Sequence, residues 1–169
     1  MQSAMFERRL RWCWMVLILG SSSSCTSPGA LPHLQLRYSS GESINIPNLR
    51  GKVVVLDFWA SWCGPCVRIM PQLQRLYERY EQHPKVAFVA INHSETPQEA
   101  EAFLQRLGIR YPNYYDIDRK TSAYFRVVGL PTTIMLSPKG EIAFIHRGFN
   151  PHDDVAALLS REVEALLVP

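Results

Sequence analysis

Cys63 and Cys66 are the two residues of this chain whose type and spacing best suit covalent chemistry. They lie in the segment Trp62-Cys-Gly-Pro-Cys66, shortly after the apolar, β-branched run Val53–Trp59. A helix that begins at Cys63 would stabilise a thiolate there through its unpaired N–H groups and its dipole, so we expect a depressed pKa for this thiol. The spacing predicts thiol–disulfide exchange, in which Cys63 attacks a substrate disulfide and Cys66 resolves the mixed disulfide.

The neighbours of the two cysteines are expected to control access to them. Pro65 suits the first turn of a helix, because its missing N–H has no intrahelical partner to lose. We expect Trp62 and Gly64 to leave Cys63 open to a partner, while Cys66 lies deeper. Trp62, Gly64 and Pro65 are therefore predicted to contact the substrate.

Strands and helices alternate around this segment. Apolar runs and turn residues first predict a hairpin over 34–37 and 43–46, a strand over 53–59, a helix from about 63 to 81, a strand over 86–91 and a helix from 97 to about 107. A connector over 113–118, with room for a short strand, and a short helix over 119–125 are expected next. Strands over 132–136 and 141–146 follow, and a last helix begins at Asn150-Pro151 and runs to about 167. Strand–helix–strand units predict an α/β fold with a parallel core, to which the closing hairpin adds antiparallel strands.

The segment Phe58-Trp-Ala-Ser-Trp-Cys-Gly-Pro-Cys66 closely resembles the active-site stretch of thioredoxins. The early hairpin and the helix inserted after Ile91 resemble the TlpA/ResA group of exported thioredoxin-like reductases. The resemblance covers residues 34–167. It implies a thioredoxin-like fold, with a central mixed β-sheet flanked by helices, an N-terminal β-hairpin and an inserted helix. It also implies a protein-disulfide reductase that needs no cofactor.

A second motif supports this resemblance. Val128-Gly-Leu-Pro-Thr-Thr133 resembles the cis-proline loop of the family, whose backbone pairs with an extended substrate segment opposite the cysteines. The resemblance implies a cis peptide at Leu130–Pro131 and a substrate-binding role for both residues. An ordinary turn proline before a strand is the alternative.

Asp57 stands inside an apolar strand, six residues before Cys63. Because burying an ionised carboxylate is costly, its pKa should rise. Thioredoxins carry an Asp at the matching position, which implies a proton acceptor for Cys66. Many proteins of the TlpA/ResA group instead have a Glu three residues after the second cysteine, where this chain has Ile69. Asp57 is therefore predicted to be the third catalytic residue, with a structural Asp bonded to backbone as the alternative.

The first 25 residues are predicted to be a signal peptide or lipoprotein leader. Three arginines precede the apolar run Trp12–Leu19, and small residues follow it. The run is shorter than the roughly 20 apolar residues that span a bilayer. Cys25 resembles the lipid-bearing residue of bacterial lipoproteins, although Ser22 stands where those leaders usually carry Leu. Cys25 is thus either a lipid attachment site or an incidental cysteine.

The charge of the domain and the spacing of its histidines limit the classes of ligand and partner that we expect. Residues 26–33 are expected to be a tether and 34–169 one domain. Without the leader, 15 basic and 14 acidic residues remain, which does not suggest a nucleic-acid-binding surface. His93, His146 and His152 share no ligand spacing, so no metal site is predicted. We expect a monomer on the extracytoplasmic face of the membrane, with protein disulfides as substrates and a thiol–disulfide relay protein in the membrane as electron donor.

Three alternatives to a reductase can be compared by the cysteines that each requires. A disulfide oxidase or isomerase would have the same residues and differ in reduction potential. A copper chaperone could bind Cu(I) through paired thiolates, but copper chaperones on related folds separate their cysteines by three residues. A peroxidase would use a lone cysteine in a loop that bears Pro and Thr, which the sequence lacks.

Overall fold

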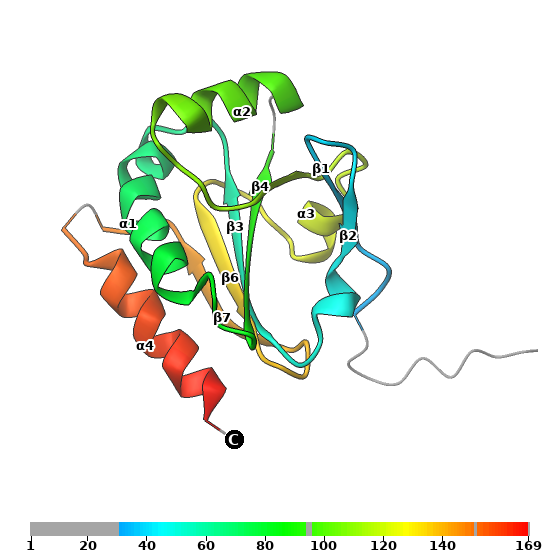
Figure 1. Ribbon diagram of the computed structural model, residues 1–169, viewed down its shortest axis with the longest axis vertical. Coiled ribbons are helices and arrows are strands. Elements are labelled where there is room, and N and C mark those ends of the chain that lie inside the picture. The colour runs from blue at the N-terminus through cyan, green and yellow to red at the C-terminus, as the bar shows by residue number, and fades with distance from the viewer. Residues whose placement is uncertain (1–30, 94–95, 151, 169) are drawn as a thin grey trace, which may run out of the picture.

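Figure 1 shows the computed structural model, which describes residues 31–93, 96–150 and 152–168. Its strands are β1 (Gln35–Tyr38), β2 (Ser43–Asn45), β3 (Val53–Trp59), β4 (Val86–Asn92), β5 (Asn113–Tyr115), β6 (Thr132–Leu136) and β7 (Ile142–Arg147). They form a seven-stranded sheet in the order β2-β1-β5-β4-β3-β6-β7. The predicted leader with Cys25, most of the predicted tether, and Pro151 lie outside the described residues.

The sheet is mixed, as predicted. β3 pairs with β4 and β4 pairs with β5 in parallel. β6 and β7 continue the sheet beyond β3 in antiparallel pairings. The N-terminal hairpin of β1 and β2 joins the other side, where β1 pairs antiparallel with β5. The short strand in the 113–118 connector is therefore the element that attaches the hairpin to the sheet.

β3 lies in the middle of the sheet and is buried along its whole length. Successive side chains of a strand point to opposite faces, and the two hydrophobic clusters follow this alternation. Val53, Val55 and Trp59 belong to one cluster, whereas Val54, Leu56 and Phe58 belong to the other. By the same alternation, Asp57 points to the face of Val55 and Trp59.

The helices are α1 (Gly64–Tyr80), α2 (Pro97–Arg106), α3 (Lys120–Tyr124) and α4 (Val155–Leu167), with a short 3-10 helix η1 (Ile46–Leu49). α1 and α4 lie side by side along one face of the sheet, and η1 and α3 lie on the other side (Figure 1). A capping box begins α2, in which Thr96 and Glu99 each accept from the other's backbone N–H. None of these helices is long and apolar enough to cross a membrane.

The predicted start of the last helix is wrong. We expected Asn150-Pro151 to open it, but α4 begins at Val155, and the side chain of Asp154 caps it by accepting from the N–H of Ala157 at 3.1 Å. Asn150 instead bonds the N–H of His152 at 3.0 Å in the preceding turn. Two cap-type residues lie close together in the sequence, and tertiary contact decides between them. Gln72 of α1 accepts from the N–H of Val155 at 2.8 Å and fixes the helix start there.

Asp154→Ala is expected to lower the free energy of unfolding by about 1 kcal/mol, because the first turn of α4 loses its side-chain cap. Urea unfolding of the oxidised protein measures this loss. Asn150→Ala is the matched control, since its side chain bonds a turn rather than the helix. A larger loss in Asn150→Ala than in Asp154→Ala would contradict the assignment of the cap.

Candidate active site

Cys63 and Cys66 form a disulfide at the start of α1, with an Sγ–Sγ distance of 2.05 Å. Cys63 is the N-cap residue of the helix, and Gly64 and Pro65 form its first turn. The sulfur of Cys63 accepts a hydrogen bond from the backbone N–H of Cys66 at 3.2 Å. The sulfur thus occupies the place of a capping oxygen, where the N–H groups and dipole of a helix favour negative charge. The position that the sequence predicted for the pair is confirmed.

The predicted exposure of Cys63 is wrong for the disulfide form. Trp62 exposes 68% of its surface, but Cys63 exposes 4% and Cys66 exposes 1%. The order is as expected, with Cys66 the deeper of the two. Cys63 is nevertheless buried, because its sulfur is bonded to Cys66 and turned into the first turn of α1. Trp62, Gly64 and Pro65 are exposed and surround it at the surface.

The Leu130–Pro131 peptide bond is cis, as the resemblance implied. Pro131 is buried and immediately precedes β6. Phe58 pairs with Thr132 across the antiparallel β3–β6 ladder, so Pro131 comes next to the end of β3 from which the chain enters the cysteine segment. Two hydrogen bonds hold this loop: Thr132 Oγ1 donates to the carbonyl of Gly129 at 2.7 Å, and Gly148 N–H donates to the carbonyl of Pro131 at 2.9 Å.

Asp57 is 1% exposed and lies on the face of the sheet that α1 covers. Burial raises its pKa from an ordinary 3.8 to about 7, and a hydrogen bond from Thr133 partly opposes this rise. Thr133 pairs with Asp57 in the β3–β6 register, and its hydroxyl donates to Oδ1 of Asp57 at 2.9 Å. The expected rise in pKa is therefore present, and its cause is desolvation. A group that titrates near neutral pH is suited to accept and return a proton.

Cys66 packs on the same face of the sheet as Asp57. It belongs to the hydrophobic cluster that contains Val55 and Trp59, the neighbours of Asp57 on that face of β3. β3 thus presents the buried acid on the face of the sheet that α1 covers, and the chain that leaves β3 supplies the cysteines. The sequence predicted this order, because Asp57 lies six positions before Cys63.

Two further features of the site were missed by sequence reasoning. One is the bond from the hydroxyl of Thr133 to Asp57. Thr133 belongs to the cis-proline motif, and pairing the strand after this motif with the strand of Asp57 could have revealed the contact. The other is a buried polar chain below the cysteine segment. The indole of Trp59 donates to Asn113 at 2.9 Å, Asn113 donates to the hydroxyl of Tyr115 at 3.0 Å, and that hydroxyl donates to the carbonyl of Pro97 at 2.9 Å. This series of hydrogen bonds fixes Trp59 against β5 and the start of α2.

The histidines have separate partners. His146 contacts Glu162 at 2.9 Å, and His93 lies 3.3 Å from Ser122. Within the part of the chain that the structure describes, no three His, Cys, Asp or Glu residues lie together as a set of metal ligands.

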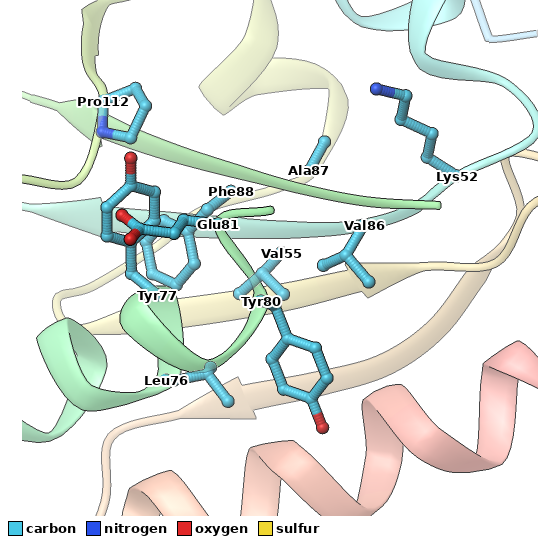
Figure 2. A pocket seen from close by; sticks show the side chains of 10 residues that line it. All are labelled: Lys52, Val55, Leu76, Tyr77, Tyr80, Glu81, Val86, Ala87, Phe88 and Pro112. Atoms are coloured by element: carbon cyan, nitrogen blue, oxygen red, sulfur yellow. The ribbon is translucent and has the colours of Figure 1, made fainter. Parts of the chain in front are cut away.

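A cavity of about 220 Å³ lies at the opposite end of α1 from the cysteines. Figure 2 shows Lys52, Val55 and Val86 on its strand side and Tyr77, Tyr80 and Glu81 on its helix side. The hydroxyl of Tyr80 points away from it toward α4, where it bonds Ser160 at 2.7 Å. No cysteine lines this cavity, which is therefore separate from the disulfide.

The geometry defines a class of protein: a thioredoxin-like fold with a redox-active CxxC pair at the start of a helix that follows a buried strand. The model of the AhpC/TSA family matches residues 29–145, and the chain belongs to this family.

Individual relatives agree with this assignment. The chain is 36% identical over 108 residues to the thiol-disulfide oxidoreductase ResA of Halalkalibacterium halodurans, a match that covers 64% of this chain and 61% of that protein. The crystal structure of StoA from Bacillus subtilis is 29% identical with a TM-score of 0.66, and the match covers 78% of this chain and 97% of that one. A secreted disulfide oxidoreductase of Mycobacterium tuberculosis is 25% identical with a TM-score of 0.68, covering 79% and 96%. The predicted fold and the resemblance to ResA are confirmed.

Asp57→Asn is expected to stabilise the oxidised protein at pH 8 and to have little effect at pH 4. Below about pH 4 both the folded and unfolded states hold the carboxyl protonated. Between there and its folded pKa of about 7, only the unfolded state ionises, so stability is lost. The full loss above that range is roughly 4 kcal/mol, which Asn avoids. Urea unfolding across this pH range measures the difference.

Asp116→Asn is the matched control. Asp116 is also buried, but its carboxylate accepts from the N–H of Thr121 and from both the N–H and the hydroxyl of Ser122. Its replacement should therefore destabilise the protein. A loss of stability at pH 8 in Asp57→Asn as well would show that Asp57 does not carry an uncompensated buried charge.

Proposed function

We propose that this chain is an extracytoplasmic thiol–disulfide oxidoreductase that reduces disulfides of other proteins. The observation that carries the proposal is the Cys63–Cys66 disulfide at the N-terminus of α1, with the cis-proline loop beside it and Asp57 buried below it. The name of ResA, a thiol-disulfide oxidoreductase, supports the same reaction class. The Gly64-Pro65 pair between the cysteines resembles that of reducing thioredoxins.

The catalytic cycle begins with the reduced pair. The thiolate of Cys63 attacks one sulfur of the substrate disulfide, which breaks that bond, forms a Cys63–substrate disulfide and releases the other substrate sulfur as a thiolate. Asp57 accepts the proton of the Cys66 thiol. The Cys66 thiolate then attacks the sulfur of Cys63, releases the second substrate sulfur and forms the Cys63–Cys66 disulfide. Two electrons have passed to the substrate, and Asp57 holds a proton for the departing thiolate.

The exposed residues around the disulfide suit a protein substrate. Trp62 offers a large apolar surface next to Cys63, and Gly64 and Pro65 offer little steric hindrance. Next to the end of β3, Leu130 and Pro131 belong to the cis-proline loop, to whose backbone an extended substrate segment can add by main-chain hydrogen bonds. Val128 of this loop is 85% exposed and extends the apolar contact.

The cycle leaves the enzyme oxidised, so it needs an electron donor. In an oxidising compartment, a thiol–disulfide relay protein of the membrane is the donor class that fits. The basic and apolar leader over residues 1–25 would deliver the chain to that compartment and hold it there, through Cys25 if this residue carries a lipid. One of the similar solved structures is described as secreted, which agrees with this location. A monomer suffices, since one chain supplies every proposed residue.

Cys66→Ala is expected to accumulate a mixed disulfide with a protein substrate, because nothing resolves the bond to Cys63. The reduced variant is incubated with insulin whose disulfides are intact. A non-reducing gel then reveals the adduct. Cys63→Ala should give no adduct and no turnover. An equal yield of adduct from both variants would contradict the assignment of Cys63 as the nucleophile.

Asp57→Asn is expected to slow the resolution of the mixed disulfide by roughly 100-fold or more near pH 7, because general-base catalysis is lost. The resolution rate of the wild type should rise with pH through the folded pKa of Asp57 of about 7, and this rise should disappear in the variant. Single-turnover fluorescence, measured at pH values on both sides of the Asp57 pKa of about 7, follows the step. Identical rate profiles would sink the proton-acceptor role of Asp57.

A further inference from the structure

Tyr111 has a buried hydroxyl that the proposed cycle does not use. The side chain is 2% exposed, and its hydroxyl has no hydrogen-bond partner among the described residues. A buried hydroxyl without a partner costs roughly 1–3 kcal/mol, so a group of this kind calls for an explanation. The ring itself is well packed, with its centroid 5.1 Å from that of Phe88 and 6.5 Å from that of Tyr77.

The sheet register brings Tyr111 to the side of Asp57. Asp57 pairs with Ala90 of β4, and Ala90 pairs with Asn113 of β5, two residues after Tyr111. Figure 2 shows Phe88 and Tyr77, the two rings that contact Tyr111, close to Pro112, the next residue in the chain. Tyr111 therefore packs on the same face of the sheet as Asp57 and Cys66.

Electrostatics agree with this placement. Burial raises the pKa of Tyr111 well above its ordinary value of 10.0, and the charge of Asp57 raises it further. The two groups are therefore within electrostatic reach, and the phenol stays protonated. Tyr77, the other tyrosine of this ring cluster, has a pKa raised by burial and by Glu81 and not by Asp57.

We propose that Tyr111 is a positioning residue for Asp57, whose otherwise unpartnered hydroxyl turns to the carboxylate when that group is ionised and stabilises the anion as a hydrogen-bond donor. In the structure the carboxyl is bonded to Thr133 and the phenol has no partner. A neutral carboxyl is a weak acceptor, whereas the ionised group accepts a stronger, charge-assisted hydrogen bond, which draws the phenol to it. Tyr111 would thus set how readily Asp57 holds the proton of Cys66, which deepens the proposed function and rests on it.

The other groups that face Asp57 leave this role open. Ala90 of β4 is apolar, and α1 contributes Cys66, whose sulfur is bonded to Cys63 in the disulfide. On the β6 side the hydroxyl of Thr133 donates to Asp57, and the pairing partner of Thr133 on β7 is His146. His146 is held by Glu162 of α4 at 2.9 Å. The phenol of Tyr111 is therefore the unpartnered donor among these neighbours within the described chain.

Carbon-13 NMR of the full oxidised protein, labelled at the Asp carboxyl carbons, tests the proposal by titration. The Asp57 signal is assigned as the one missing from Asp57→Asn. Tyr111→Phe should raise the proton affinity of Asp57 by about tenfold, because the anion loses a donor while the packing of the ring is kept. Tyr77→Phe, the control from the same ring cluster, should leave the titration unchanged. At pH 4, where Asp57 is neutral, Tyr111→Phe should be at least as stable as the wild type.

Two outcomes separate this inference from the proposed function. An unchanged Asp57 titration in Tyr111→Phe overturns the role of Tyr111, and it does so even if the resolution of the mixed disulfide depends on Asp57. A tenfold rise in Tyr111→Phe supports the link between the two side chains, and it does so even if Asp57→Asn resolves the mixed disulfide at the wild-type rate. An equal rise in Tyr77→Phe would also overturn the proposal, because it would assign the effect to packing.

Discussion

The first turn of α1 holds a sulfur atom where most helices hold a capping oxygen, and the rest of the site depends on this arrangement. The Sγ of Cys63 accepts from the N–H of Cys66 at 3.2 Å, which places both sulfurs in the positive field of the helix start. β3 must end at this point to deliver the cysteines, and its complete burial between α1 and the opposite cluster fixes that end. The antiparallel β6 then brings the cis-proline loop to the same edge.

The buried carboxyl of Asp57 lowers the stability of the fold at neutral pH. Seven consecutive residues of β3 are buried, and Asp57 is the charged residue among them. A carboxyl with one hydroxyl donor is poorly compensated in an apolar cluster, which is why its pKa rises to about 7. The same desolvation that weakens the fold at neutral pH produces a group that titrates there, which the proposed proton exchange with Cys66 requires. Stability and proton transfer therefore oppose each other at this residue.

The local chemistry could be predicted from the sequence, but the long-range contacts could not. The start of α1, the cis bond before Pro131 and the raised pKa of Asp57 each follow from a short motif or from one residue in an apolar run. The N-cap of α4 depends on Gln72, 83 residues away from the helix start, so cap propensities alone gave the wrong residue.

Burial of Cys63 and the bond from Thr133 to Asp57 depend on packing and strand register in the same way. The attachment of the N-terminal hairpin depends on β5, which is only three residues long. So short a strand has too few residues for its sequence to show which strand it pairs with. These features required the assembled sheet.

The reduction potential of the Cys63–Cys66 pair tests the central claim most directly. Equilibration of the protein with glutathione buffers gives it, and the account predicts a value near or below about −250 mV, close to that of thioredoxin and suited to a reductase. A value between about −180 and −120 mV would contradict the account, because that range belongs to isomerases and oxidases of disulfides.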